Sequence, residues 1–540
     1  MTQITKAVNE PILSFAAGSP ERASLQAKYD EMATQTIEIP LIIDGKEIKT
    51  GDMGNCVMPH NHQHVLATYH KAGETEVIQA IDASMKSWKT WSKTSLEERT
   101  KIFRKAAELL QGPWRDTINA ATMLNQSKNA FQAEVDAACE LIDFFNFNAQ
   151  YAEEITANQP LISPEGMHNH LEYRPLEGFV FAITPFNFTS IAGNLPSAPA
   201  LMGNVALWKP ASSAVLPCYY IMKMLEEAGL PPGVINFIPG SGGKVGNPVL
   251  SNSNLAGVHF TGSTATFHHI WKTIGKNIDK YKTYPRIVGE TGGKDFCLAH
   301  ESVGLDELST AMIRGAFEFQ GQKCSAMSRA YIPTTIWDAL KNKYLSELET
   351  VKVGSPRDFT NFMNAVIDKP AFDSIVSYID YANESDDAEI ISGGTYDDSK
   401  GYFIQPTTIL TTDPHFKTME EEIFGPVLTI YLYDPTEWNS IIDLVDSTSP
   451  YALTGCIMGK DKEALGEAKD RLAHSAGNFY INDKPTGAVV GQQPFGGSRA
   501  SGTNDKAGSQ LNLFRWLSLR TVKETFDTPK DYRYPFLQED

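Results

Sequence analysis

Short, uninterrupted apolar runs alternate with amphipathic stretches along the middle of the chain. The runs Phe179–Ile183, Val205–Trp208 and Val234–Ile238 are typical of strands buried on both faces. Between two of them, Ser213–Ala228 carries apolar residues at helical spacing and ends before Gly229. Strands that alternate with helices predict a parallel sheet covered on both faces, with ligands at the carboxyl ends of the strands. We therefore predict an α/β fold.

The same patterns predict the elements on either side of this region. The first fifty residues are mixed and predicted to be partly extended, ending in a hairpin at 40–48 around Asp44-Gly45. Residues 160–174 turn polar and predict an excursion from the compact body. Further helices are predicted at 74–91, 96–111, 129–154, 196–202, 305–318, 335–349, 371–382, 438–446 and 462–472. Further strands are predicted at 257–260, 330–332, 389–391, 427–431, 478–481 and 516–523.

Composition narrows the class of protein. A chain of 540 residues with 42% apolar and 21% charged residues is typical of a soluble protein with two or three domains. The formal net charge of -18 argues against a nucleic-acid or anionic-membrane partner, either of which needs a basic face. No apolar run reaches the roughly 18 residues of a membrane helix.

The cysteines and the N-terminus point to a compartment. The six cysteines show no repeated spacing, which favours a reducing environment over a disulfide framework. The N-terminal segment has neither an apolar signal core nor an arginine-rich leader free of acidic residues. We expect a cytoplasmic protein; the alternative is a mitochondrial matrix enzyme whose leader is absent from this chain.

Cys324 is the first candidate for chemistry. It follows the predicted helix 305–318 at a turn, with Lys323 before it and Ser325 after it. The thiolate is the nucleophilic form, and nearby positive charge lowers the pKa of a thiol. Two interpretations are open from the residues alone: a nucleophile, or a small apolar core residue.

Two other patterns carry weaker signals. His60, His62 and His64 alternate and could bind a metal, but the only other likely ligand nearby is Cys56, so we predict no metal site. The glycine-rich loop Gly240–Gly246 follows a predicted strand, where backbone amides and a helix N-terminus can hold phosphate. Its GxGGxxG spacing leaves a dinucleotide site and plain tight turns both open.

Six stretches in order along the chain resemble the aldehyde dehydrogenase superfamily. Each is a weak signal alone, and the ordered set covers most of the chain. They are Pro185-Phe186-Asn187-Phe188, Leu207-Trp208-Lys209-Pro210, Gly289-Glu290-Thr291-Gly292-Gly293-Lys294, Gly321-Gln322-Lys323-Cys324, Glu421-Glu422-Ile423-Phe424-Gly425-Pro426 and Pro494-Phe495-Gly496-Gly497-Ser498.

Longer runs resemble one branch of that superfamily, the branch that oxidises L-glutamate 5-semialdehyde. These runs are 185–195, 491–497 and 501–505. The resemblance implies NAD-dependent conversion of the semialdehyde, formed from 1-pyrroline-5-carboxylate, into L-glutamate, the second step of proline catabolism. The chain has no room for the proline dehydrogenase domain found fused in some organisms, so a monofunctional form is expected.

The resemblance also implies an architecture. We expect an N-terminal arm and Rossmann-like NAD-binding domain at 1–289, interrupted by a flap at 155–174, and an α/β catalytic domain at 290–511. Residues 512–540 would complete the oligomerisation flap and form the C-terminal tail. Exposed strand edges need a cover, so we expect a homodimer or a higher homo-oligomer.

Three catalytic roles follow from the resemblance. Cys324 would add to the aldehyde carbon, and the Asn187 side-chain amide with the Cys324 backbone N–H would hold the oxyanion. Glu290 would act as general base on the water that releases the acid, which works best with a raised pKa. Gly292 and Gly293 would give Glu290 freedom to swing aside.

The resemblance assigns the cofactor and substrate contacts as well. NAD is expected, although NAD-preferring relatives often carry an acidic residue where this chain has Ser212, so that choice rests on the branch alone. The cofactor residues would be Thr184, Lys209, Gly262, Ser263, Glu422 and Phe424. The substrate residues would be Phe188, Ser325, Gly487, Ala488, Phe495 and Glu140.

The substrate residues have distinct expected roles. Gly487 and Ala488 in the loop 485–489 would offer backbone amides to the α-carboxylate, helped by the Ser325 hydroxyl. Phe188 and Phe495 would sandwich the aliphatic chain, or be ordinary core aromatics. Related enzymes often carry serine in place of Ala488. Glu140 would face the ammonium group, or be a solvated helical carboxylate.

Three alternatives compete with this interpretation. The nearest is a dehydrogenase of another semialdehyde, such as succinate semialdehyde. The second is a thiol hydrolase that uses Cys324 without a cofactor. The third is a nucleotide-binding or structural protein that retains the fold without the activity. The presence of Cys324, Glu290 and Asn187 together argues against this third alternative.

Overall fold

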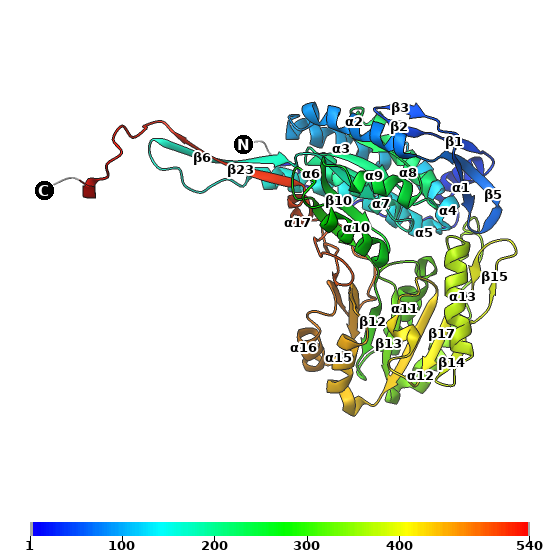
Figure 1. Ribbon diagram of the computed structural model, residues 1–540. Helices are drawn as coiled ribbons and strands as arrows, with labels where there is room; N and C mark the ends of the chain where they lie inside the picture. The colour runs from blue at the N-terminus through cyan, green and yellow to red at the C-terminus, as the bar shows by residue number, and fades with distance from the viewer. Residues whose placement is uncertain (1–3, 538–540) are drawn as a thin grey trace.

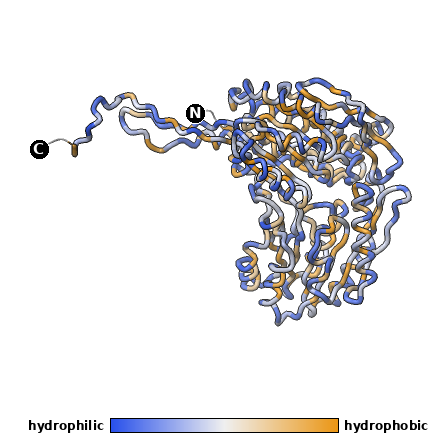
Figure 2. Tube along the Cα trace, viewed as in Figure 1, coloured by the Kyte–Doolittle hydropathy of each residue, from blue (hydrophilic) through white to orange (hydrophobic). Residues whose placement is uncertain are grey.

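The computed structural model describes residues 4–537. Two large sheets form two regions, one above the other in the view of Figure 1, and a long ribbon projects from the side of the upper region. Each large sheet has seven strands. Hydrophilic segments predominate on the outside of this body, and many of the hydrophobic segments run through its interior (Figure 2). The predicted α/β fold class is confirmed.

The first sheet runs in the order β11-β10-β7-β8-β9-β2-β3. Its strands from β11 to β9 are parallel, and β2 and β3 form an antiparallel edge. The bounds are β2 Leu41–Ile43, β3 Lys46–Ile48, β7 Phe179–Ile183, β8 Val205–Lys209, β9 Ile235–Phe237, β10 Leu255–Thr261 and β11 Arg286–Glu290. The chain moves outward from β7 to β9 and then returns to the other side of β7 with β10. That reversal creates a crevice at the carboxyl ends of β7 and β10, where ligands bind in such sheets.

Helices cover both faces of this sheet. Right-handed crossovers place α7 and α8 on one face and α9 and α10 on the other; α3, α4 and α6 pack with the first pair, and α2 packs with α9. The bounds are α2 Glu74–Trp91, α3 Leu96–Gln111, α4 Arg115–Gln126, α6 Leu141–Ala157, α7 Thr189–Leu201, α8 Val215–Glu227, α9 Gly242–Leu250 and α10 Thr264–Lys276. A separate three-stranded sheet is formed by β1 Ile37–Ile39, β5 Asn61–His70 and β4 Met53–Met58.

The second sheet runs in the order β14-β17-β18-β13-β12-β20-β21 and is parallel except at β14. Its strands are β12 Asp295–Ala299, β13 Met327–Pro333, β14 Ala388–Ser392, β17 Thr407–Thr411, β18 Val427–Tyr433, β20 Thr454–Met458 and β21 Asn478–Ile481. Its helices are α11 Leu305–Phe317, α12 Thr334–Leu348, α13 Lys369–Asn383, α14 Lys417–Glu420, α15 Trp438–Ser447 and α16 Lys462–Arg471. Shorter strands are β15 Tyr396–Asp397, β16 Phe403–Ile404, β19 Tyr451–Ala452 and β22 Ser498–Arg499.

The projecting ribbon pairs two distant parts of the chain. Strands β6 (Met167–Pro175) and β23 (Leu517–Thr525) are antiparallel over their whole length, from Leu517↔Pro175 to Thr525↔Met167. Helix α17 (Gln510–Phe514) precedes β23, and the chain continues beyond the ribbon, away from the body (Figure 1). The expected division at 289/290 and 511/512 stays a prediction; the chain passes from the first sheet to the second between β11 and β12.

Several elements differ from the sequence-based expectation. Residues 20–33 form helix α1 (Pro20–Ala33) rather than mixed, partly extended chain: Ser19 Oγ accepts from the Arg22 N–H at 3.3 Å, and Pro20 opens the helix. Helix α4 was not predicted, because five of its polar side chains are buried and interrupt the helical pattern of apolar residues. These five are Arg115, Asn119, Thr122, Asn125 and Gln126.

The predicted helix 129–154 is also more complex than its period suggests. It consists of α5 (Ala130–Ala133), a π-helical segment (Glu134–Glu140) and α6, which continues to Ala157. π-Helical segments widen the turn by one residue and are frequent at functional sites. Within residues 4–537, no helix is long and apolar enough to cross a membrane.

Candidate active site

A cavity of about 830 Å³ opens at the carboxyl ends of β7, β8 and β10, where the strand order of the first sheet reverses. Cys324, Glu422 and Phe424, from the connections that precede β13 and β18 of the second sheet, also line it. Eight residues expected from the sequence line this one cavity: Thr184, Asn187, Lys209, Gly262, Ser263, Cys324, Glu422 and Phe424.

Cys324 stands on a tightly constrained loop after α11. Phe319 and Gln320 adopt left-handed backbone conformations, with φ of 50° and 55°. Gly321 follows with φ of 63°, and a Cβ there would lie 2.3 Å from the Gly425 carbonyl oxygen, so only glycine fits. The buried Gln320 amide donates to the Ala365 carbonyl at 2.9 Å and fixes the loop to the segment that precedes α13. Strain of this kind persists where the surroundings hold it in place.

Asn187 connects the first sheet to the nucleophile loop. It follows β7, is buried, and donates from Nδ2 to the Gln322 carbonyl at 3.1 Å. A side-chain amide has two N–H donors. One is used by this bond, and the second is left for a group in the cavity that Asn187 and Cys324 share. The role of Asn187 as an oxyanion donor stays a prediction.

The electrostatics around Cys324 differ from the sequence-based expectation. Burial raises the pKa of the Cys324 thiol well above its usual value, and the carboxylates of Asp295, Glu290 and Glu422 raise it further. Lys323 does not offset this, because its ammonium is paired with Glu318 at 3.0 Å. The expectation that Lys323 favours the thiolate is therefore wrong for this structure. Cys324 rests as a thiol.

Glu290 ends strand β11 and turns toward the loop 496–497. Its Oε2 accepts the Gly497 N–H at 3.0 Å, and its charge reaches Cys324. Burial raises the pKa of Glu290 well above that of an ordinary carboxyl, partly opposed by the Gly497 N–H and by Lys506. A carboxyl whose pKa is raised toward neutrality is the form suited to general-base chemistry.

The outer part of the cavity is rich in glycine. Gly242, Gly243 and Gly246 lie at the start of α9 and line the cavity, and a Cβ on any of them would meet open space. Their backbone is therefore accessible at a helix N-terminus, where N–H groups favour an anion. The loop Gly240–Gly246 was recognised in the sequence, but these glycines were not among the predicted site residues.

Two ionisable side chains, Lys209 and Glu422, line the cavity. Lys209 Nζ donates to the Pro210 carbonyl at 3.0 Å, and burial lowers the pKa of this amine to about 8. Glu422 Oε1 accepts the Gly293 N–H at 3.0 Å, and burial raises the pKa of this carboxyl to about 7. Both retain capacity for further hydrogen bonds, as ligands for hydroxyl groups require.

Close contacts explain why glycine, rather than a larger residue, occupies positions 292 and 293. A Cβ on Gly292 would lie 2.3 Å from a Glu422 carboxylate oxygen, and one on Gly293 would lie 2.2 Å from the Cys324 carbonyl oxygen. The two glycines therefore let the Glu290–Lys294 segment pass between Glu422 and the nucleophile loop. Their expected role in releasing Glu290 stays a prediction.

The residues predicted to hold substrate lie outside the lining of this cavity. Ser325, next to the nucleophile, shares a hydrogen bond with Thr486 at 2.8 Å, which ties the loop 485–489 to the nucleophile loop. Thr486 is buried and was not among the predicted site residues, although it lies within the loop recognised from the sequence. Gly487 and Ala488 follow it directly.

Phe188 and Glu140 lie beside the same buried polar groups, Lys128 and Asp136. Lys128, fully buried, pairs with Asp136 at 2.6 Å and stands 4.2 Å from the centre of the Phe188 ring. Glu140 accepts from Ser190 Oγ at 2.6 Å, and burial next to Asp136 raises the pKa of Glu140 to about 8. Phe495 comes from another segment, where its backbone pairs with Ala507. The substrate roles of Phe188, Phe495 and Glu140 stay predictions.

Two of the three alternating histidines, His60 and His62, bond other parts of the protein. His60 is buried between the Tyr29 hydroxyl at 2.9 Å and the Ser127 hydroxyl at 3.1 Å, and burial lowers its pKa to about 3. His62 bonds the Asp398 carbonyl at 2.8 Å. Among residues 4–537, no group of three metal-ligating side chains comes together.

Residues 48–522 match the aldehyde dehydrogenase family, and the chain belongs to that family. The chain is 52% identical over 532 residues to the mitochondrial delta-1-pyrroline-5-carboxylate dehydrogenase of Dictyostelium discoideum, covering 98% of this chain and 95% of that protein. It is 46% identical over 538 residues to the enzyme of the same name from Homo sapiens, covering 99% and 95%.

Solved structures extend the comparison to three dimensions. The chain superposes on the crystal structure of the delta-pyrroline-5-carboxylate dehydrogenase of Mycobacterium tuberculosis bound with NAD, with a TM-score of 0.96 and 49% identity over 100% of this chain and 99% of that one. A 1-pyrroline-5-carboxylate dehydrogenase from Thermus with bound NAD gives a TM-score of 0.91 at 31% identity, over 97% and 100%.

Proposed function

We propose that this chain oxidises L-glutamate 5-semialdehyde, the open form of 1-pyrroline-5-carboxylate, to L-glutamate with NAD. The observation that carries the proposal is the cavity in which Cys324 and Asn187 meet the predicted cofactor residues Lys209 and Glu422. Full-length similarity to enzymes named for this substrate supports the choice of aldehyde.

The cavity fits a dinucleotide. Gly242, Gly243 and Gly246 leave backbone room for a pyrophosphate at the start of α9. Lys209 would hold the adenosine ribose and Glu422 the nicotinamide ribose. Thr184, Gly262, Ser263 and Phe424 complete the lining. When bound, NAD supplies a hydride acceptor.

The first half of the reaction forms a bond to Cys324. Sulfur adds to the aldehyde carbon, and the negative charge on oxygen is held by the free Asn187 amide N–H and the Cys324 backbone N–H. In the tetrahedral thiohemiacetal, collapse of the oxyanion re-forms the C=O bond and expels the hydrogen as hydride, for which a bound NAD would be the acceptor. This leaves a thioester on Cys324. Because the raised pKa of Cys324 favours the thiol, its proton passes to solvent water before the sulfur adds to the aldehyde carbon.

The second half hydrolyses the thioester. Glu290 takes a proton from water as the water oxygen attacks the thioester carbon. The carbon–sulfur bond then breaks, which releases the carboxylic acid and regenerates Cys324. The hydrogen bond that the Gly497 N–H donates to Glu290 orients the carboxylate and connects it to the Pro494–Gly497 loop.

The semialdehyde carries an α-carboxylate and an ammonium group that need partners. We assign the carboxylate to the Gly487 and Ala488 backbone amides, beside the Ser325–Thr486 hydrogen bond. Phe188 and Phe495 would enclose the aliphatic chain. Glu140 would face the ammonium, and a positive charge beside it would favour the ionised carboxylate.

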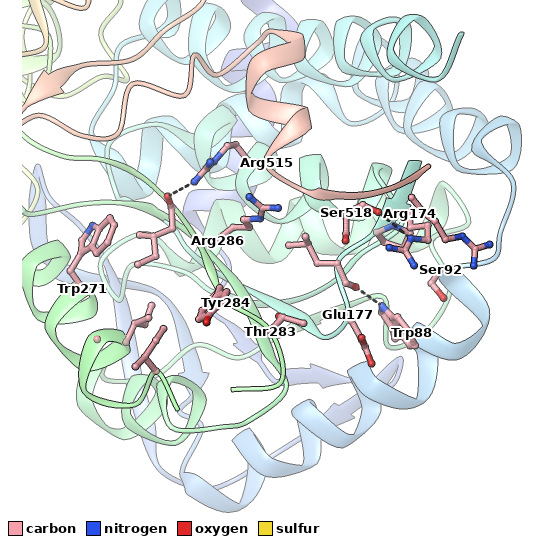
Figure 3. Close-up of a pocket in the computed structure, with 18 of the residues that line it drawn as sticks. Trp88, Ser92, Arg174, Glu177, Trp271, Thr283, Tyr284, Arg286, Arg515 and Ser518 are labelled. Carbon is pink, nitrogen blue, oxygen red and sulfur yellow. Dashed lines mark hydrogen bonds between the residues drawn. The ribbon is translucent and has the colours of Figure 1, made fainter. Parts of the chain in front are cut away.

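The projecting ribbon supports a homodimer or a larger homo-oligomer. Both outer edges of β6 and β23 are exposed, and Leu519 and Phe526 are 44% and 66% exposed. At its base lies a second cavity of about 930 Å³, lined by Trp271 and Tyr284 beside Arg286 and Arg515 (Figure 3). Exposed apolar area of this kind marks an association surface. Light scattering of the purified protein measures the assembly.

For the compartment, we propose the cytoplasm, with the mitochondrial matrix as the alternative. All six cysteines are free and buried, which suits either reducing environment.

The test is reduction of NAD or NADP, followed by absorbance, with three substrates: pyrroline-5-carboxylate, succinate semialdehyde and a simple aliphatic aldehyde. We expect a strong preference for the first with NAD. Equal rates with all three contradict the substrate assignment while leaving Cys324 and Glu290 in place. Absence of cofactor reduction by folded protein contradicts the dehydrogenase itself, and cofactor-free ester turnover alone would indicate a thiol hydrolase.

A further inference from the structure

Lys506 lies under the loop that holds the general base. Its Nζ donates to the Gly477 carbonyl at 2.7 Å and to the Gly496 carbonyl at 3.1 Å. The next residue after Gly496 supplies the N–H that Glu290 accepts. The Lys506 side chain therefore holds the loop 496–497 in place through its backbone carbonyl. The backbone of Lys506 itself is left-handed, with φ of 52°.

A second residue reinforces the same clamp. Asn478 Oδ1 accepts the Gly496 N–H at 3.1 Å, and its Nδ2 donates to the Pro494 carbonyl at 3.1 Å. The Lys506 ammonium lies 3.5 Å from Asn478 Oδ1. The loop 494–497 is thus fixed to β21 through Asn478 and to the C-terminal segment through Lys506.

The charges that face Glu290 come from three directions. Lys506 favours the ionised carboxylate, whereas Asp505 opposes it, and the Cys324 thiol interacts with Glu290 across the site. Asp505 is itself paired with Arg515 at 3.3 Å, which weakens its effect. Burial lowers the pKa of Lys506, and Glu290 raises it, so each of the two charges stabilises the other.

We propose that Lys506 is a positioning residue for the hydrolytic half-reaction: its ammonium clamps the loop 496–497 and supplies a positive charge that favours the ionised form of Glu290. The proposal rests on Glu290 acting as the general base of the proposed function. Lys506 has no direct part in the chemistry in this role. It acts through Glu290 and the Gly497 N–H.

The direction of the effect follows from the charges. Without Lys506, the carboxylate of Glu290 loses a favourable charge and its pKa rises. The base is then protonated up to a higher pH, so the acid limb of the hydrolysis rate moves in the alkaline direction. Loss of the clamp acts in the same direction, because a looser Gly497 N–H stabilises the carboxylate less.

The experiment follows hydrolysis of the acyl-enzyme without a cofactor. p-Nitrophenyl acetate transfers its acetyl group to Cys324 with loss of p-nitrophenolate, and mass spectrometry follows loss of the acetyl group against pH. In Lys506→Met we expect the midpoint of the acid limb to rise by about one pH unit. Lys506→Arg should stay near the parent midpoint, and so should Lys462→Met, which removes an exposed lysine on α16.

Separate outcomes distinguish the two proposals. An unchanged midpoint in Lys506→Met, with thermal unfolding like that of the parent, overturns the role of Lys506. A Lys506→Arg midpoint that moves as far as that of Lys506→Met overturns the part assigned to charge. Glu290→Gln should slow hydrolysis by about a hundredfold or more; normal hydrolysis in that variant instead contradicts the proposed base.

Discussion

The Asn187 side chain donates a hydrogen bond to the Gln322 carbonyl, two residues before Cys324, at 3.1 Å. Asn187 belongs to the loop after β7 of the first sheet, and Gln322 to the loop before β13 of the second. This hydrogen bond joins the two halves of the molecule beside Cys324. It fixes the position of the Asn187 amide relative to the loop that carries Cys324.

Asn187→Ala is expected to lower kcat by about a hundred- to a thousandfold, because a preorganised oxyanion donor is lost. The measurement is the rate of NADH formation with pyrroline-5-carboxylate. Asn194→Ala is the matched control, since it removes a buried amide from α7 that bonds Asn148 outside the cavity. A fall in kcat of equal size in both variants would assign the effect to lost packing rather than to the oxyanion.

The resting state of Cys324 can be tested by alkylation. Because burial and three carboxylates raise its pKa above the usual range, the thiolate fraction is small at neutral pH and grows as the pH rises. The rate of iodoacetamide modification in the free protein should rise by about tenfold per pH unit between about pH 7 and 9. Cys324→Ser supplies the background from the other cysteines. A plateau below about pH 8 would show an activated thiolate and contradict the assignment.

Part of this site was predictable from the sequence and part was not. β7, α2 and α3 were predicted residue for residue, because an unbroken apolar run and two strong helical stripes are local signals. α4 was missed because its buried polar side chains find partners only in the folded protein, which no local pattern records. The π-helical segment Glu134–Glu140 was missed for a related reason, since the helical period continues through it.

The candidate site shows the same division. Cys324 and Asn187 were assigned through motifs, and the structure places both on one cavity. The pKa of Cys324 could not be inferred, because Lys323 finds its partner in Glu318, five residues earlier, and the opposing carboxylates come from elsewhere. A charged neighbour in the sequence is a poor guide to the pKa of a side chain, because burial and the partners found in the folded protein determine that pKa.

Gly292 and Gly293 provide a matched pair of substitutions. In Gly293→Ala the new Cβ meets the backbone carbonyl of Cys324, which cannot move without shifting the nucleophile. In Gly292→Ala it meets the end of the Glu422 side chain, which can rotate away. We therefore expect Gly293→Ala to abolish turnover and lower the melting temperature. Gly292→Ala should fold like the parent and chiefly raise the KM for NAD.

Steady-state kinetics and thermal unfolding of both variants decide the matter. Equal and full activity in Gly293→Ala would mean that the Cys324 loop has more freedom than its left-handed residues suggest. An unchanged KM for NAD in Gly292→Ala would contradict the assignment of Glu422 as a cofactor ligand.

Ala488 offers a gain-of-function test of the substrate loop. Ala488 lies two residues after Thr486, which shares a hydrogen bond with Ser325. A hydroxyl at position 488 would therefore stand beside the backbone amides assigned to the α-carboxylate. In Ala488→Ser one additional hydrogen bond to that carboxylate should lower the KM for pyrroline-5-carboxylate by about three- to tenfold. The KM for a simple aliphatic aldehyde, which has no carboxylate, should stay at the parent value. An equal fall in both KM values would mean that the substitution reshapes the loop generally, and the carboxylate would then have to be placed elsewhere.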